Sequence, residues 1–401
     1  MDEHAPTLAN IDYAALRAYR LGRVRAELAG CDFAGALLYD PINIRYASDS
    51  SNMQLWTMHT AARYLFVATT GPVILFDFHG CGHLSAHLDL IGEIRPAVPF
   101  TYFLAGSEGA RRVHDWASEI ADLMTTHGGG NRRIAVDRCE PDAAQALIDL
   151  GLEIGDGQGV LERARMIKSA EEIQCMRIAI AACEAGMAAM RANSVPGATE
   201  NEVWSHLHQV NIAMGGEWIE TRLLAAGPRT NPWFHECGPH AIENGDMLSF
   251  DTDLIGPTGY CADISRSWLV GDAKPTDEQK RLYGLALEQI DYNMRFMRPG
   301  VTLREITEQA WPMPDDFVAN RYSVIAHGVG LCDEYPSIYY PEDFVVTGYD
   351  DTIHENMTLC VESYIGRVGG AEGVKIEQQV LVTADGPRLL SHFPLEEDLM
   401  R

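Results

Sequence analysis

The pattern of apolar residues changes near Lys168, and this change most restricts the folds open to a chain of 401 residues. Before it, short apolar runs alternate with stretches of helical periodicity. The runs cover residues 35–40, 63–69, 72–78 and 133–137, and the helical stretches lie near 13–29, 108–125 and 141–150. This alternation predicts an α/β domain with a parallel or mixed sheet. Because the chain is long enough for two domains with full cores, we predict a first domain over residues 1–167.

After residue 168 the helices come first and the strands follow. Ser169 and Glu172 have the spacing of a capping box that opens a helix. Further helices are expected from Thr199, over 276–297 and after Thr302. Strands are expected near 219–226, 246–253, 260–270, 322–326, 357–363 and 373–382. This order predicts a second, α+β domain over residues 168–401.

Composition excludes several classes of function. The formal net charge of −26 argues against nucleic acid and anionic membranes, which bind basic surfaces. No apolar run reaches the roughly 18 residues of a membrane span, and the N-terminal MDEHAPTLAN lacks the apolar core of a secretory signal. The nine cysteines are scattered without a CxxC pair, which is typical of reduced thiols. We therefore expect a cytoplasmic protein that binds neither nucleic acid nor membrane.

Three aspartates stand close together in MLSFDTDLIGPTGYCADISRSW. Asp251 and Asp253 would share one face of a strand, because strand residues two apart point the same way. The turn at 256–259 predicts a hairpin that brings Asp263 alongside them. Carboxylates this close raise one another's pKa unless a cation lies between them. Taken alone, the segment also fits a solvated acidic hairpin.

Three further side chains stand near the ends of predicted strands. His327 lies in VIAHGVGL, Glu362 ends TLCVE, and Glu377 lies in GVKIEQQVLVT. Each has an ordinary explanation on its own, as a hydrogen-bonded core histidine or a solvent-facing glutamate. Together with the aspartates, they form an ordered set of oxygen and imidazole donors along the second domain.

This order, with its flanking words, resembles the pita-bread metalloenzymes, the family of methionine aminopeptidase, aminopeptidase P, prolidase and creatinase. The words are RxxKSxxEI at 165–173, GYxxD at 259–263, HGxGL at 327–331, the strand-final Glu362 and EGVKIE at 372–377. NIRYAS at 43–48 is similar to the leading domain of the creatinase type. The resemblance implies a creatinase-like N-terminal α/β domain followed by a C-terminal pita-bread domain.

The resemblance also implies a metal site. Asp263, His327, Glu362 and Glu377 match ligand positions of the family. The family's first aspartate would fall at position 252, which is Thr here, with Asp251 and Asp253 on either side. Oxygen donors with one imidazole suit iron, manganese, cobalt or zinc, and bridging carboxylates permit one or two ions. The predicted ligands are Asp251, Asp253, Asp263, His327, Glu362 and Glu377.

The chain departs from the peptidases of this family after HGVGL. The peptidases carry a second histidine there, whereas this chain has Asp333 in HGVGLCDEYP. A carboxylate cannot donate a hydrogen bond to an oxyanion unless it is protonated, but it can act as a general base. His235, in AGPRTNPWFHE, matches the substrate-side histidine of the family, and the alternative is a loop residue without a chemical role.

With its extra aspartate and its retained ligands, the chain resembles the dimethylsulfoniopropionate lyases of marine bacteria, a branch of this family. That resemblance implies a homodimer with iron that cleaves this small zwitterion to dimethyl sulfide and acrylate. A metal would stabilise charge on the substrate carboxylate as a Lewis acid, while Asp333 removes the proton.

Two aromatic residues are candidates for binding the sulfonium, and the base has two further candidates. Tyr322 could hold the cation on its ring face, or it could be a packed strand aromatic. Trp56, in the aromatic-rich run 50–64, could close the pocket from the partner subunit, or it could be an interface or core residue. If Asp333 is not the base, Tyr322 and His235 are next.

Other functions remain open on the sequence alone. An X-Pro-type metallopeptidase or dipeptidase would use the same ligand set, but Asp333 replaces a histidine that such enzymes use. A non-catalytic pita-bread binding module would have no need for the ligands. A lyase or hydrolase that acts on another small betaine would fit the same residues.

Overall fold

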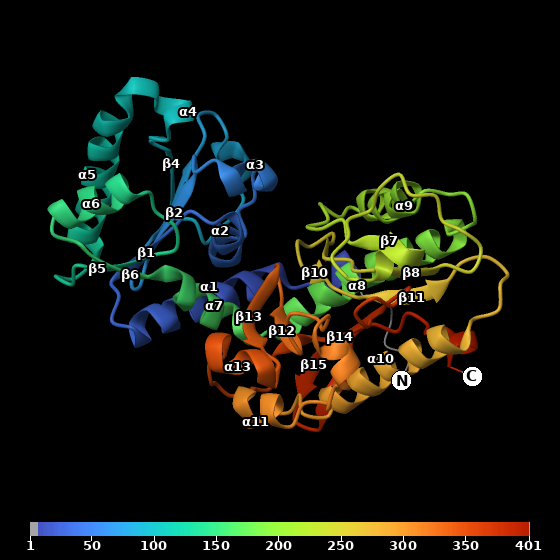
Figure 1. Ribbon diagram of the computed structural model, residues 1–401. Coiled ribbons are helices and arrows are strands. Elements are labelled where there is room, and N and C mark those ends of the chain that lie inside the picture. Colours follow the sequence, from blue (N-terminus) through green and yellow to red (C-terminus); the bar gives the residue numbers. More distant parts are fainter. Residues whose placement is uncertain (1–6, 401) are drawn as a thin grey trace. The chain divides into compact units, whose positions relative to one another are not determined.

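The computed structural model describes residues 7–400 and divides into two compact units (Figure 1). The leading unit is Asp12–Arg165, and the second unit contains residues 7–11 and 166–400. The two units divide between Arg165 and Met166, two residues before the predicted boundary between residues 167 and 168.

The leading unit contains a six-stranded sheet in the order β4-β3-β2-β1-β5-β6. Its strands are β1 (Gly35–Leu38), β2 (Tyr64–Ala68), β3 (Val73–Asp77), β4 (Glu93–Pro96), β5 (Arg133–Val136) and β6 (Glu153–Asp156). The sheet is mixed, because β1 pairs antiparallel with β2 and parallel with β5. The four predicted apolar runs form β1, β2, β3 and β5. The unpredicted β4 and β6 are only partly buried edge strands, so they lack an apolar pattern.

Helices complete the leading unit. They are α1 (Tyr13–Gly30), α2 (Pro41–Ser48), α3 (Gln54–His59), α4 (Tyr102–Ala105), α5 (Gly109–His127), α6 (Pro141–Asp149) and α7 (Gly157–Met166). Trp116 and Ile120 of α5 join Phe66 and Phe76 of the sheet in one core, and all four side chains are almost fully buried. An α/β arrangement therefore holds in this unit, as the alternating pattern predicts.

The second unit contains the four helices that the sequence predicts, α8 (Ala170–Asn193), α9 (Glu200–Ala213), α10 (Asp277–Met294) and α11 (Leu303–Glu308). Two short helices, α12 (Asp315–Val318) and α13 (Pro341–Thr347), were not predicted. Capping boxes open the four predicted helices, at Ser169, Thr199, Thr276 and Thr302. Helix α8 is long and apolar enough to cross a membrane by composition, but 61% of its apolar window is buried inside the protein, as in a core helix.

Antiparallel sheets follow in the second unit. The largest has the order β13-β12-β14-β15-β16, formed by β12 (Ala326–Val329), β13 (Asp333–Ile338), β14 (Thr358–Ile365), β15 (Val374–Thr383) and β16 (Gly386–Leu389). A three-stranded sheet contains β7 (Leu224–Ala226), β8 (Met247–Phe250) and β11 (Arg266–Leu269), and a hairpin contains β9 (Leu254–Ile255) and β10 (Cys261–Ala262).

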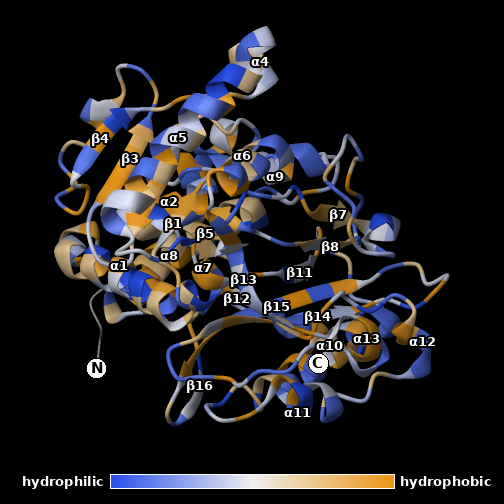
Figure 2. Cartoon of the chain, turned by 90° about the vertical axis from the view of Figure 1, so that its left-hand side faces the viewer, coloured by the Kyte–Doolittle hydropathy of each residue, from blue (hydrophilic) through white to orange (hydrophobic). Residues whose placement is uncertain are grey.

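Four predicted strands differ from the observed ones. The strand predicted over 219–226 begins only at Leu224, and the region predicted over 260–270 forms two short strands, β10 and β11. The strand predicted over 322–326 begins only at Ala326. The strand predicted over 246–253 ends at Phe250, so Asp251 and Asp253 lie outside it. Hydrophilic segments interrupt the hydrophobic colouring of β15 in Figure 2, although every residue from Val374 to Val382 is buried. Polar residues buried in a core sheet mark the region of the site.

Candidate metal centre

The largest sheet places three of the predicted ligands on adjacent strands. His327 comes from β12, Glu362 from β14 and Glu377 from β15. Glu362 and Glu377 are direct cross-strand partners, and both are completely buried. Like charges placed opposite each other in a sheet are destabilising, so this pair needs a cation nearby.

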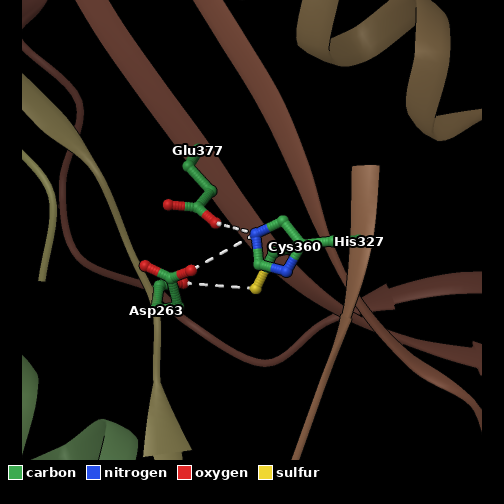
Figure 3. A group of neighbouring side chains, drawn as sticks. All are labelled: Asp263, His327, Cys360 and Glu377. Carbon is green, nitrogen blue, oxygen red and sulfur yellow. Dashed lines mark hydrogen bonds and ion pairs between the residues drawn. The ribbon is translucent and has the colours of Figure 1, made fainter. Parts of the chain in front are cut away.

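The imidazole of His327 lies among the acidic side chains. Its Nε2 atom is 3.4 Å from Asp263 Oδ2, 3.4 Å from Glu362 Oε1 and 3.7 Å from Glu377 Oε1. Figure 3 shows Asp263, His327 and Glu377 pointing toward one another, with Cys360 beside them. The Nδ1 atom donates to the Gly328 carbonyl at 3.0 Å, which leaves the lone pair on Nε2. This tautomer is the one that binds a metal through Nε2.

Several carboxylate oxygens at this point have no hydrogen-bond partner. Among the described residues, Asp263 Oδ1, Glu362 Oε1 and Glu377 Oε1 are buried and unpaired. Buried polar atoms are almost always satisfied in proteins, so oxygens without a hydrogen-bond partner that converge on one point indicate a binding site for a cation. The donor set therefore fits a metal ion held by Asp263, His327, Glu362 and Glu377.

The predicted aspartates lie together, but not by the predicted geometry. Ligand oxygens of Asp251, Asp253 and Asp263 are within 4.8 Å of one another. The expectation that Asp251 and Asp253 share one face of a strand is wrong, because β8 ends at Phe250 and Asp253 adopts a left-handed φ of +37°. Thr252 between them donates to Ala262 O and accepts from Ile264 N, both at 2.9 Å. An irregular loop, fixed by Thr252, thus brings these carboxylates together.

The electrostatics of the cluster also require positive charge. Burial raises the pKa of Asp253, of Asp263 and of Glu377 well above their ordinary values, and neighbouring carboxylates raise them further. Burial also tends to raise the pKa of Asp251, but Lys375 and hydrogen bonds lower it to about 2. Without added cations, the cluster cannot carry all of its negative charges.

One buried charge of the site, Lys375 of β15, was not predicted from the sequence. Its Nζ atom lies 2.6 Å from Glu362 Oε2 and 3.0 Å from Asp251 Oδ2, and the side chain is fully buried. The signal was present in the word VKIE, because Lys375 precedes Glu377 by two residues and so shares its face. A lysine in an alternating strand ordinarily faces solvent, which is why the signal was not used.

Asp333 opens β13 beside the imidazole. Its Oδ1 atom is 3.7 Å from His327 Nδ1, and its side chain is 52% exposed. Partial burial raises the pKa of Asp333, while His327 opposes that shift. The next residue, Glu334, accepts from Lys168 Nζ and from Leu331 N, both at 2.9 Å. These buried contacts fix the backbone that carries Asp333.

Tyr322 lies at the cluster and lines a cavity. Lys375 Nζ is 4.4 Å from the centre of its ring, and the ring of Phe234 stacks on it at 5.4 Å. The ring predicted to face a sulfonium therefore already contacts an ammonium. The cavity has a volume of about 360 Å³ and is lined by Arg321, Tyr322, Ser323, Tyr339, Asp343 and Thr347.

The two remaining candidates, His235 and Trp56, make their described contacts outside the acidic cluster. His235 is partly exposed, and its Nδ1 atom lies 3.1 Å from the Pro232 carbonyl. Its neighbour Phe234, which was not predicted, is the residue that reaches Tyr322. Trp56 belongs to α3 of the leading unit, where its ring packs against Phe78 at 5.3 Å.

Comparison with known proteins agrees with this site. Residues 174–384 match the family described as metallopeptidase family M24. The chain is 43% identical to dimethylsulfoniopropionate lyase DddP of Roseovarius nubinhibens over 398 residues, covering 98% of this chain and 89% of that protein. Identity to the lyase of the same name from Roseobacter denitrificans is 40% over 402 residues, covering 99% and 90%.

Solved structures share the fold at lower identity. An Xaa-Pro dipeptidase from Bacillus anthracis superposes with a TM-score of 0.75 and 22% identity, covering 94% of this chain and 98% of that one. The prolidase of Pyrococcus horikoshii gives 0.73 and 20%, covering 94% and 99%. The predicted two-part fold is thereby confirmed.

Proposed function

We propose that this chain, which belongs to metallopeptidase family M24, uses the metal centre of that family for an elimination reaction instead of peptide hydrolysis. The substrate would be dimethylsulfoniopropionate, and the products would be dimethyl sulfide and acrylate. The observation that carries the proposal is the 43% identity to a lyase of that name over 98% of this chain. Asp333 supports it, because a carboxylate stands where the peptidases have an imidazole.

The residues present fit a metal centre with one or two ions. Asp263, His327, Glu362 and Glu377 would hold one ion, and Asp251, Asp253 and Asp263 would surround a second position. Iron is our choice, and manganese, cobalt or zinc would suit the same donors. When bound, the metal would supply Lewis acidity toward the substrate carboxylate.

Asp333 is proposed as the general base. It would take the proton from the carbon next to the substrate carboxylate. The C–H electron pair would then form the double bond of acrylate, and the C–S pair would leave with neutral dimethyl sulfide. The leaving group needs no acid, so no second imidazole is required. A half-exposed carboxylate beside His327 is positioned to be reached by substrate.

The pocket would be formed by aromatic residues and by a second subunit. Tyr322 lines the cavity, and we propose that its hydroxyl contacts the substrate there and that His235 is a second substrate-contacting residue. We further propose a cytoplasmic homodimer in which the partner's leading domain brings a copy of Trp56 to the pocket. Neither nucleic acid nor a membrane would be bound, in keeping with the net charge of −26.

An X-Pro dipeptidase is the second candidate, favoured by the fold that the chain shares with such enzymes. A non-catalytic module is less well supported, because the unpaired buried oxygens of the cluster would serve nothing in it.

Headspace gas chromatography tests the proposal directly. Purified, iron-loaded protein should release dimethyl sulfide from dimethylsulfoniopropionate, while Asp333→Ala and a chelated sample should not. Gas from Asp333→Ala would move the base to Tyr322 or His235. If a wild-type sample with stoichiometric metal released no gas but hydrolysed Xaa-Pro dipeptides, the peptidase would replace the lyase.

A further inference from the structure

We propose that Lys375 is an internal counter-cation that keeps the carboxylates of the metal centre assembled when no metal is bound. This inference rests on the proposed metal centre. The ammonium is fully buried and contacts three acidic side chains, at 2.6 Å from Glu362 Oε2, 3.0 Å from Asp251 Oδ2 and 3.6 Å from Glu377 Oε2. It also donates to Ser265 Oγ at 2.7 Å.

Lys375 and the metal would use opposite oxygens of the same two glutamates. The ammonium lies at the Oε2 atoms of Glu362 and Glu377. The Oε1 atoms of both residues have no hydrogen-bond partner, and they are 3.4 and 3.7 Å from His327 Nε2. Lysine and metal therefore do not compete for one oxygen. The ammonium can stay in place as metal binds and leaves.

Ser265 extends the support on the lysine side. Its hydroxyl lies 2.5 Å from Asp251 Oδ1 and 2.9 Å from Glu377 Oε2. Lys375 and Ser265 together thus contact both oxygens of Asp251 and one oxygen of each glutamate. These contacts hold the two glutamates in the arrangement that leaves their Oε1 atoms open to a metal.

The charges explain why such a cation matters. Five carboxylates form the cluster, and the single ammonium of Lys375 reduces their formal charge from −5 to −4. Two divalent ions would neutralise that remainder. With a neutral side chain at position 375 and no metal, the imidazole of His327 would be the one basic side chain left among five buried carboxylates in the described chain.

The test is a comparison of Lys375→Met with wild type, with and without metal, using manganese as the probe. In chelator, the Tm of Lys375→Met should lie about 10 °C below that of wild type, because a buried ion pair has lost one partner. Saturating manganese should close more than half of this gap. Metal therefore raises the Tm of the variant by more than that of wild type. Lys375→Arg, which keeps the charge, should recover part of the loss in chelator.

Lys168→Met is the matched control. Lys168 is also a buried ammonium, and its ion-pair partner within the described chain is Glu334 Oε2 at 2.9 Å instead of a carboxylate of the cluster. Its loss of Tm should be the same with and without manganese. An equal loss for Lys375→Met in both conditions, or no loss in chelator, would overturn the proposal. A variant that folds only when manganese is present would support it.

The outcome is separable from that of the proposed function. The comparison in chelator involves no metal and no substrate, so it stands whether or not dimethyl sulfide is released. A wild-type protein that binds metal but shows no lyase activity would leave the role of Lys375 intact.

Discussion

Each unit of this protein buries a basic side chain, and the two burials differ in charge balance. In the leading unit Arg63 meets Asp77 at 3.2 Å, and both residues are 1% exposed. In the second unit Lys375 meets a cluster of five carboxylates. The first pair is neutral by itself, so it can serve as structure alone. The second group keeps an excess of negative charge, and an excess that is buried requires something from solution.

Loss of a candidate metal ligand from the carboxylate cluster of the second unit should have the largest effect. Glu377→Gln removes a charged oxygen donor from the candidate metal centre, so bound metal should fall and kcat should drop by more than the roughly 10- to 100-fold that loss of an outer-shell partner costs. Elemental analysis and dimethyl sulfide release measure the two quantities. Asp77→Asn is the matched change in the leading unit and should leave metal content at the wild-type level. Equal metal loss in both variants would break the comparison.

Asp333→Asn should separate chemistry from metal binding. Removing a general base typically costs about 10²- to 10⁴-fold in rate, and we expect a loss of that size in kcat. Metal content should stay unchanged, because Asp333 is half exposed and stands beside the cluster. A variant that lost its metal would show instead that Asp333 is a ligand.

Arg63→Met tests the charge-balanced Arg63–Asp77 pair of the leading unit. It leaves Asp77 buried without its cation, and breaking a buried pair costs about 3–5 kcal/mol of unfolding free energy. Because the pair lies in the other unit, this loss should be the same in chelator and in manganese, as urea unfolding can measure. A metal-dependent loss would mean that the two units are coupled.

The smallest effect is expected at Asp137, a carboxylate whose hydrogen-bond partners in the described chain are neutral N–H groups. It accepts from Tyr39 N at 2.8 Å, Asp40 N at 3.1 Å and Asn43 Nδ2 at 2.9 Å, yet burial raises its pKa to about 6. The folded pKa exceeds the unfolded one, so its contribution is fully present below about pH 4 and is lost as pH rises through 6. The loss is at most about 3 kcal/mol at 1.4 kcal/mol per pKa unit.

Unfolding in urea at pH 5 and at pH 7.5 checks this sign. Wild type should gain stability relative to Asp137→Asn when the pH is lowered. A difference between the two proteins that does not change with pH would show that Asp137 titrates normally.

Local chemistry made much of the fold predictable. A capping box is complete within four residues, so the start of α8 at Ala170 could be read from Ser169 and Glu172. The apolar runs of the leading sheet were equally clear. The ligands on β12, β14 and β15 followed from a family resemblance, since an isolated His327 or Glu362 means little by itself.

The features that escaped prediction depend on distant partners. The left-handed Asp253 is held by Thr221, whose hydroxyl donates to its Oδ2 at 2.7 Å across 32 residues. Lys375 is buried because its partners Asp251 and Ser265 come from more than a hundred residues away. No local pattern specifies such contacts, whereas a buried charge at strand spacing from a ligand is a signal that sequence analysis can use.

Even-numbered and odd-numbered residues of strand β15 point to opposite faces of the sheet. Even-numbered Val374, Ile376 and Val380 belong to the hydrophobic core, whereas odd-numbered Lys375 and Glu377 reach the carboxylate cluster. Loss of one residue ahead of this run would exchange the two sets, placing methyl groups at the metal and charges in the core. Loss of two would preserve them. Over evolution, this strand can therefore shift its register only in steps of two residues.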